Sequence, residues 1–385
     1  MHYFVFPEID TTLYEASGSG NSGLDEILEV RKTMSDSGGN VKVSRILIKF
    51  DLSEISKSIV DEVISTDAKY YLNMYDAMSE NLTTSQSLYA YPISGSWLEG
   101  DGTFSDDPQT TEGASWQYRD GETQRTYWLA SGSNVLGGET SISASGGAWF
   151  TSSFGSQSFA YETTDMRMDV TPVVNEWLNG THPNNGFIVK RSGSFGNADS
   201  ETDEGSQDRL GVFKFFSRQT HTIYPPKLEV EWHDAKWSTG SLSALSSTEL
   251  EDLSVYMKSL RPEYKEKSKV KFRLVGRAKY PTKSYSNTAS EYLTAKYLPS
   301  GSKGNVGGTG TYYSVRDAQT EDIIVPYGTG SLVSCDSTGN YFNLWMNGLQ
   351  AERYYKFEFK VVSGSDTVDE TVQYFDDDFV FKVVR

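Results

Sequence analysis

The chain has few residues that could cross-link it or anchor it. Its 385 residues include a single cysteine, Cys335, so no disulfide bond forms within the chain and a secreted disulfide scaffold is excluded. No apolar run approaches the ~20 residues of a membrane-spanning helix. The opening segment MHYFVFPEID lacks the basic and apolar regions of a signal peptide, which predicts a protein made and kept in the cytoplasm.

Residues that carry catalysis or bind zinc are equally sparse. The lone Cys335 has no histidine near it in the sequence, and no G-x-S-x-G motif stands between a strand and a helix. The glycines of 301–311 do not match a phosphate-binding loop. Zinc is not expected, because the histidines are scattered and unpaired: His2, His182, His221 and His233.

Positive charge is scarce in the first part of the chain. Residues 1–235 hold 16 Lys+Arg and 34 Asp+Glu, a net charge of −18, whereas residues 236–385 hold 19 and 18, a net charge of +1. This contrast predicts two bodies with different surfaces. An acidic surface repels phosphate backbones, so nucleic acid is not expected as a partner.

What the chain does have is aromatic residues, glycine and a two-residue alternation of apolar and polar side chains. There are 24 Tyr, 19 Phe, 8 Trp and 34 Gly. Alternation predicts strands throughout: in the first part at 45–52, 69–75, 87–93, 185–191, 209–217 and 227–232, and in the second at 253–260, 268–277, 321–327, 341–349, 353–362 and 378–384. We therefore predict an all-β chain with two domains, 1–235 and 236–385.

Helices and loops complete this outline. DVTPVVNEWLNG (169–180) predicts a helix with Asp169 or Thr171 as its N-cap and Gly180 as its end, and residues 53–64 predict one or two short amphipathic turns. Long loops at 100–124, 131–147 and 192–208 are typical of functional segments or of segments that a partner orders.

Several segments, taken in order, resemble one family. DTTLYEASGSGNSGLDEILEV (10–30), SRILIKFDLSEI (44–55), SWLEG (96–100), MDVTPVVNEWLNGTHPNNGFIVK (168–190) and YPPKLEVEW (224–232) are similar to DNRLRE-type modules. The resemblance implies a jelly-roll β-sandwich over roughly residues 8–232, of a kind that includes carbohydrate-binding modules. The chain departs from the family in long inserts between Asp101 and Thr164 and in Ser-Arg-Gln at 217–219, where an acidic residue is common.

The second part resembles a different group. SKVKFRLVGRAKYP (268–281), LVSCDSTGNYFNLWMNGLQAERYYKFEFKVV (332–362) and the terminal FKVVR are similar to C-terminal β domains in structural proteins of large tailed phages, notably those of marine cyanobacteria. We expect an immunoglobulin-like β-sandwich here. The resemblance implies a non-enzymatic virion protein of the neck, tail, baseplate or fibre attachment, whose partners are copies of itself and other virion proteins.

Trp97 has three interpretations, because Glu99 and Asp101 follow it in a glycine-rich stretch. It is a structural residue at the rim of a sandwich, a platform for stacking a sugar, or part of a glycosidase site built from two carboxylates. In the family that the chain resembles, SWLEG belongs to the ordinary consensus, which favours the structural interpretation.

Further aromatic residues lie in or near the long loops. They are candidates for a protein interface or for contact with a host surface glycan, and a hydrophobic cluster under the loops is the alternative. A glycan-binding adhesin is therefore the alternative function. Together with Trp97, the candidate contact residues are Trp116, Trp128, Trp149 and Phe150.

Two more features complete the expectations. Jelly-roll modules often hold a structural calcium ion, the one cofactor considered, and Asp10, Glu15 and Asp25 around the first Gly/Ser loop are its candidate ligands. The basic stretch 259–273 has two explanations: lysines that protect a sheet edge, or a surface that docks onto acidic partners such as the first domain of another copy. No membrane insertion is expected, and the virion is the expected location.

Overall fold

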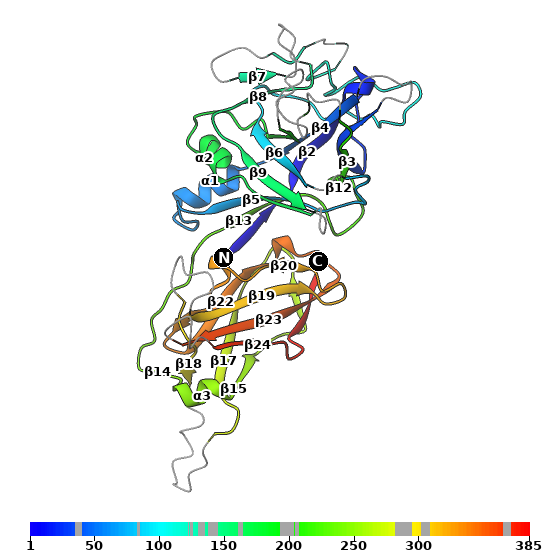
Figure 1. Ribbon diagram of the computed structural model, residues 1–385. Coiled ribbons are helices and arrows are strands. Elements are labelled where there is room, and N and C mark those ends of the chain that lie inside the picture. Colours follow the sequence, from blue (N-terminus) through cyan, green and yellow to red (C-terminus); the bar gives the residue numbers. More distant parts are fainter. Residues whose placement is uncertain are drawn as a thin grey trace, which may run out of the picture. The chain divides into compact units, whose positions relative to one another are not determined.

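The chain folds into two compact units (Figure 1). The computed structural model describes residues 1–34, 41–82, 85–121, 123, 126–129, 135–137, 145–160, 165–192, 204, 208–281, 295–301, 309–364 and 371–385. The first domain comprises Val5–Val63 and Lys69–Glu229, and the second comprises Met1–Phe4, Ile64–Ala68 and Val230–Arg385. The sequence placed the boundary at 235/236 and did not assign the first four residues to the second domain.

The first domain is built from antiparallel strands. Its larger sheet has the order β12-β3-β4-β11-β6-β9, and β2 also pairs with β4. The bounds are β2 (Pro7–Tyr14), β3 (Ile27–Met34), β4 (Val41–Phe50), β6 (Ser85–Pro92), β9 (Gly155–Ala160), β11 (Phe187–Arg191) and β12 (Gly211–Phe216). Three further strands lie side by side: β13 (Lys227–Glu231), β5 (Lys69–Met74) and β10 (Met166–Asp169). A short hairpin joins β7 (Val135–Gly137) and β8 (Ala148–Phe150).

Strand β4 lies in a part of the sheet that is buried on both faces. Its central residues Ile46, Leu47 and Ile48 are all fully buried although successive side chains point to opposite faces. One face carries Phe50, whose ring lies 6.3 Å from that of Phe187 on the neighbouring strand β11. The other face is covered by the cluster of tryptophans described below, so the sheet is buried on both sides.

The described part of the first domain includes two short helices. α2 (Thr171–Leu178) confirms the helix predicted from 169–180, with Pro172 in its first turn and Gly180 beyond its end at φ +73°. Its N-cap is Val170, and the Asp169 carboxylate accepts the Thr171 N–H at 2.9 Å. α1 (Ser53–Val60) forms where a short amphipathic segment was expected, and a 3₁₀ turn, η1, spans Glu15–Ser17.

The second domain contains two sheets. The first has the order β14-β18-β17-β22-β21, with β15 pairing to β17, and the second has the order β16-β25-β23-β19-β20, with β24 pairing to β23. The first sheet's bounds are β14 (Ser243–Ala244), β15 (Leu253–Lys258), β17 (Lys269–Ala278), β18 (Lys296–Tyr297), β21 (Ser334–Asp336) and β22 (Gly339–Trp345). The second sheet's bounds are β16 (Glu263–Lys265), β19 (Gly310–Asp317), β20 (Ile323–Val325), β23 (Arg353–Ser363), β24 (Thr371–Phe375) and β25 (Val380–Val384). Among the described residues of this domain, helical turns are limited to α3 (Ser247–Glu251), η2 (Thr329–Ser331) and η3 (Met346–Gly348).

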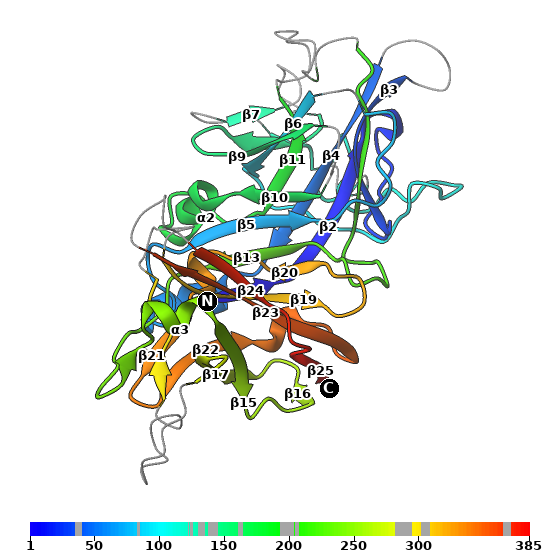
Figure 2. The ribbon, with the colours of Figure 1, turned by 60° about the horizontal axis from the view of Figure 1, so that its bottom comes forward.

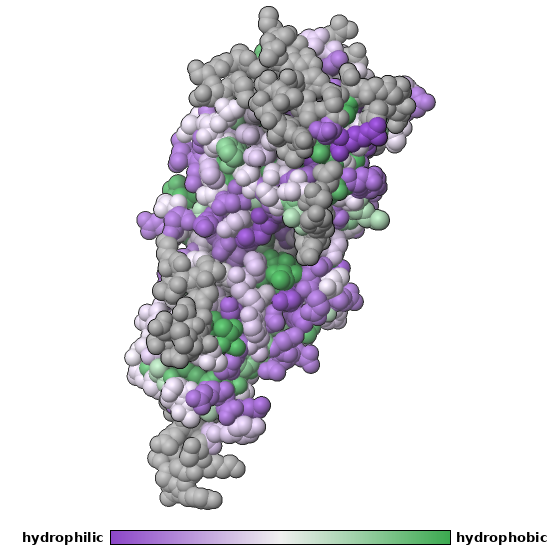
Figure 3. All heavy atoms as spheres, in the orientation of Figure 1, coloured by the Kyte–Doolittle hydropathy of each residue, from purple (hydrophilic) through white to green (hydrophobic). Residues whose placement is uncertain are grey.

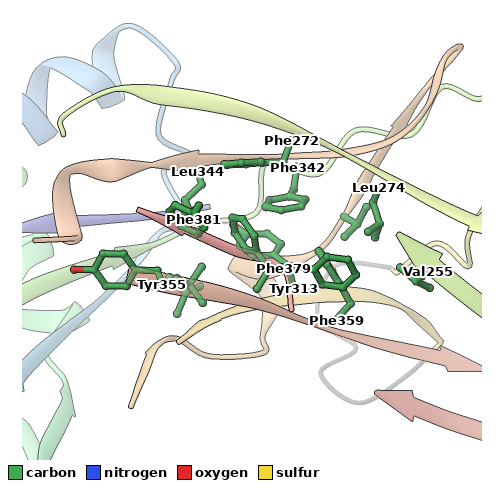
Figure 4. Packing of buried hydrophobic residues seen from close by; sticks show 14 of the residues in the cluster. Val255, Phe272, Leu274, Tyr313, Phe342, Leu344, Tyr355, Phe359, Phe379 and Phe381 are labelled. Atoms are coloured by element: carbon green, nitrogen blue, oxygen red, sulfur yellow. The ribbon is translucent and has the colours of Figure 1, made fainter. Parts of the chain in front are cut away.

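The core between these sheets is aromatic. Phe272 and Phe342 from the first sheet face Phe357 from the second, with ring centroids 4.8 to 5.2 Å apart (Figure 4 shows Phe272 and Phe342). Each of these strands alternates buried and outward positions, as the two-residue pattern predicts. The result is a sandwich whose centre is filled by stacked and edge-on rings.

The chain's first residues complete this core. Phe4, in β1 (His2–Val5), is 4% exposed and belongs to the second domain's hydrophobic cluster. Its ring lies so close to Gly348 that a side chain there would clash, and its carbonyl accepts a hydrogen bond from Asn347 at 2.7 Å. Residue 4 thus packs against residues more than 340 positions later.

The prediction of an all-β sandwich protein is confirmed. Each strand predicted from alternation overlaps a strand of the structure, with ends differing by a few residues. None of the helices within the described ranges combines the length and the apolar character needed to cross a bilayer.

Candidate functional site

The four candidate tryptophans lie in one buried cluster of the first domain. Trp97, Trp116, Trp128 and Trp149 are 1% to 6% exposed and pack with Leu13, Leu47 and Ile188 of the sheet, among other residues. Two of the indole N–H groups are satisfied internally: Trp97 donates to the Asn185 carbonyl at 2.8 Å and Trp128 to the Ser115 carbonyl at 2.9 Å. The rings therefore form the hydrophobic cluster that was the alternative to exposed contact residues.

A buried cation lies against this cluster. The guanidinium of Arg45 on β4 lies 4.9 Å from the ring centre of Trp116 and 5.1 Å from that of Trp149. Its Nη1 donates to the Gly146 carbonyl at 2.6 Å. An arginine in the middle of an apolar strand is thus accommodated by two indole faces and a carbonyl.

Glu204 neutralises this part of the interior. Its carboxylate accepts hydrogen bonds from Arg45 Nη2 at 2.7 Å and Nε at 3.2 Å, and lies 3.2 Å from Lys190 Nζ. All three side chains are at most 1% exposed. One carboxylate thus serves two buried cations, in the charged and hydrogen-bonded form in which buried charges are tolerated.

Phe150 differs from the tryptophans because it is half-buried and lies beside polar residues. Its ring stacks on His182 at 3.7 Å, and His182 Nε2 lies 3.1 Å from Ser152 Oγ. Glu176 accepts from Ser152 Oγ at 3.1 Å. Serine, histidine and carboxylate are the members of a hydrolase triad, but Glu176 lies 3.8 Å from the same Nε2 that faces Ser152. In a triad the acid orients the other ring nitrogen, so this geometry does not activate the serine.

The opening motif SWLEG reaches a second cluster through Glu99. The Glu99 carboxylate accepts from the Asp10 N–H at 3.1 Å and from Arg218 Nη1 at 2.9 and 3.0 Å, and Gln219 Nε2 donates to it at 3.3 Å. The Ser-Arg-Gln segment at 217–219, noted as a departure from the resembling family, therefore supplies the cation that balances Glu99.

Asp10 is the unusual member of this cluster. It is 1% exposed; one oxygen accepts the Arg218 N–H at 2.7 Å, while Oδ1 has no hydrogen-bond partner in the part of the chain that the structure describes. Burial raises the pKa of Asp10 to about 7, against the opposing effect of the Arg218 hydrogen bond, and Glu99 adds to the rise. A carboxyl group with a raised pKa beside a second carboxyl group is a pattern of glycosidase sites. However, a substrate oxygen cannot reach a carboxyl group that is this deeply buried.

The three calcium candidates are not brought together. Glu15 accepts from Lys42 Nζ at 2.9 Å and from the Val43 N–H at 3.0 Å, and Asp25 accepts the Phe104 N–H at 3.1 Å. Burial raises the pKa of Asp25 to about 6. Asp10, Glu15 and Asp25 do not join any group of converging metal ligands among the described residues. Each carboxylate is used by a local contact instead.

A candidate binding surface lies in the second domain, where the sequence showed a basic stretch. Residues 258–279 contain nine Lys+Arg and two Asp+Glu. The rest of 236–385 therefore holds 10 Lys+Arg (19 − 9) and 16 Asp+Glu (18 − 2). A groove of about 1060 Å³ runs over this stretch. We call it the basic groove; its charged and aromatic lining comprises Tyr256, Lys258, Arg261, Glu263, Tyr264, Lys265, Lys269, Lys271, Arg273 and Arg277.

Strand alternation explains why the cations gather on one face. On β17 the inward positions Phe272 and Leu274 are buried in the aromatic core, and Lys269, Lys271, Arg273 and Arg277 therefore point outward. Figure 2 shows β17 with its neighbours β15 and β22. Outward positions on one strand repeat every ~6.6 Å, so the cations form a row about 26 Å long.

Aromatic rings from the flanking strands accompany this row. Lys269 lies 5.0 Å from the ring centre of Trp345, Lys271 lies 3.7 Å from Tyr341, and Arg277 lies 5.9 Å from Tyr256. Rings hold the long side chains against the sheet and supply apolar contact area between the charges.

Only part of this charge is neutralised by the domain itself. Asp336 on β21 pairs with Arg273 at 2.6 Å and with Lys271 at 2.9 Å, and the Arg273 hydrogen bonds hold the pKa of Asp336 well below its ordinary range. Within the described ranges, no carboxylate forms an ion pair with the remaining five cations: Lys258, Arg261, Lys265, Lys269 and Arg277. The groove therefore carries an uncompensated positive potential.

No family model matches the chain, and no curated protein is similar enough in sequence to be counted as a relative. The resemblances noted in the sequence therefore rest on the quoted segments alone.

Proposed function

We propose that the chain is a non-enzymatic structural component of a tailed-bacteriophage particle and that it acts through protein–protein assembly. The observation that carries the proposal is the contrast between the two kinds of candidate site. The tryptophans and carboxylates singled out as binding or catalytic residues are used by contacts inside the first domain. The groove with unpaired charge is a broad sheet face, which suits contact with another protein surface.

The shape of the available surface agrees with this proposal. On the face shown in Figure 3, hydrophobic residues form small patches among hydrophilic ones. The basic groove combines cations with Tyr256, which is 43% exposed, and with the rings of β22. Tyrosine, tryptophan and arginine are the residues on which protein interfaces most often depend. The phage context comes from the resemblance of the second part to virion proteins.

The experiment is direct detection in particles. We expect mass spectrometry of purified virions from the phage that encodes the chain to detect it at a fixed copy number, and antibody labelling in electron micrographs to place it in the neck, tail, baseplate or fibre attachment. Virions that lack the chain would contradict the proposal.

A glycan array provides the contrast with the adhesin alternative. Because Trp97 and Trp116 are buried, we expect no glycan binding that Trp97→Ala or Trp116→Ala selectively removes without unfolding the domain. Binding that is lost in a folded Trp97→Ala variant would support the adhesin instead.

A further inference from the structure

We propose that the basic groove of one copy binds the acidic helix surface around α1 of a second copy. This inference rests on the proposed function and names the contact through which assembly occurs. The contact joins two different patches, so it is heterologous and propagates from copy to copy as a ring or a filament.

The groove requires an acidic partner. Five of its cations lack an ion pair within the described part of the chain, and only Glu263 contributes a carboxylate to the lining. Opposite potentials across an interface speed encounter and exclude partners of the wrong sign. The chain has a net charge of −17, and residues 1–235 alone carry −18, so a second copy offers the opposite charge in abundance.

The surface around α1 fits the groove in both charge and apolar character. Residues 51–63 hold four carboxylates and one lysine. The helix turns its apolar Ile55 inward and leaves Val60 78% exposed, and Val63, three residues beyond the helix, is 46% exposed. We call this the acidic helix surface; its exposed charged and apolar residues are Asp51, Glu54, Lys57, Val60, Asp61, Glu62 and Val63.

The dimensions and the chemistry of the two surfaces agree. An eight-residue helix is about 12 Å long, which fits within the row of about 26 Å on β17. Carboxylates of the helix reach the lysines, while the exposed valines meet Tyr256 and the stems of the long side chains. An exposed valine pair amid four carboxylates is otherwise unexplained on a domain surface.

A single-stranded nucleic acid is the competing occupant, because grooves with cations and aromatic rings also bind such strands. The charge of the whole chain argues against it. Residues 1–235 of the same molecule carry a net charge of −18, which repels a phosphate backbone, and this acidic part of the chain contains the acidic helix surface.

The experiment uses the full chain and two charge-reversed variants in sedimentation velocity. The groove variant carries Lys265→Glu and Lys269→Glu, and the helix variant carries Glu54→Lys and Asp61→Lys. We expect the wild-type chain to self-associate at about 50 mM salt and to dissociate at about 500 mM, because the charges are exposed and screened by salt. Each variant alone is expected to associate at least about tenfold more weakly.

Mixing the variants tests the pairing itself. The groove variant keeps an intact helix surface, the helix variant keeps an intact groove, and the two reversed surfaces are opposite in charge, so an equimolar mixture is expected to associate again although each variant alone associates only weakly. A chain that carries all four reversals is expected to associate again. The matched control, Lys236→Glu with Lys360→Glu, reverses two cations outside the groove and is expected to associate like the wild type.

The outcomes separate this inference from the proposed function. Association that both variants leave unchanged would overturn the groove contact while leaving an assembly function in place. A wild-type chain that stays monomeric, but binds oligodeoxythymidylate through the groove, would overturn the contact in favour of a nucleic acid. A monomeric chain that is also missing from virions would overturn both proposals.

Discussion

At the scale of single residues, the interior of the first domain depends on one carboxylate. Glu204 lies between Arg45 and Lys190, all three almost fully buried. Buried ions are costly to leave alone, and removing one partner usually destabilises a domain more than the pair had stabilised it.

Replacing this carboxylate should therefore be severe. Glu204→Gln keeps the shape of the side chain and leaves two buried cations without a countercharge, so we expect a loss of about 3–5 kcal/mol in the free energy of unfolding. Urea denaturation followed by tryptophan fluorescence measures it. The control Glu8→Gln removes a partner of Lys49 in an exposed pair and should cost less than about 0.5 kcal/mol. A loss at Glu204 below about 1 kcal/mol would show that another group balances the cations.

Asp10 should impose a pH dependence on stability. Its pKa is about 7 when folded and about 4 in an unfolded chain, so between these values the folded state holds a proton that the unfolded state releases. Stability from the protonated carboxyl is fully present below about pH 4 and is lost as the pH rises through 7. Glu99 and Arg218 are the ionisable groups that face the same carboxyl.

The variant Asp10→Asn isolates this effect. It keeps an acceptor for the Arg218 N–H and removes the buried charge, so we expect a melting temperature about 2–4 °C or more above the wild type at pH 8 and little difference at pH 4. Asp25, whose pKa is about 6, should leave a smaller slope in the variant. Parallel curves for the two proteins from pH 4 to 8 would contradict the role given to Asp10.

At the scale of elements, β1 belongs to the domain that the chain completes last. Phe4 fills a place in the second domain's core between residues of η3 and the aromatic strands. The local sequence does not predict this position of Phe4, because HYFVF predicts only a short strand before the first Gly/Ser loop.

Truncating that ring tests the assignment. Phe4→Ala should cost about 3–5 kcal/mol, as the loss of a buried phenyl ring does, and should raise amide hydrogen exchange in β22 and β23. Phe6→Ala is the matched control, since Phe6 is 43% exposed and lies two residues away. Equal effects of the two substitutions would argue against a specific place for Phe4 in the core.

Most elements could be predicted from alternation because side chains in a half-buried strand must alternate. The segment KVKFR shows this clearly: its apolar residues entered the core, and its cations formed the row on the outer face of β17. The candidate site was less accessible to prediction. Exposure of Trp116, Trp128 and Trp149 depends on how long loops fold over a sheet, and composition alone does not record that.

Contacts between distant segments could not be predicted from the sequence either. Arg218 was visible only as a departure from a resembling pattern, and its partner Glu99 lies 119 residues earlier. Likewise, Ser152, Glu176 and His182 meet because α2 and the loop after β8 lie together, which no spacing rule predicts.

At the scale of the whole molecule, the two parts of the chain differ in charge as well as in structure. The acidic excess lies in residues 1–235, and nine of the 19 Lys+Arg of the second part lie in residues 258–279. One of the two proposed binding surfaces is therefore negatively charged and the other is positively charged. The association of the chain should therefore respond to salt more strongly than its stability does.

The place of Phe4 in the second domain also has a consequence for biosynthesis. The hydrophobic cluster that contains it extends to Val383, so 379 (383 − 4) more residues must leave the ribosome before the cluster is complete. At about 5–20 residues per second, this takes roughly 20–80 s. During that time the first domain can fold on the nascent chain while the leading hydrophobic residues stay uncovered, available to a chaperone until translation delivers their binding site.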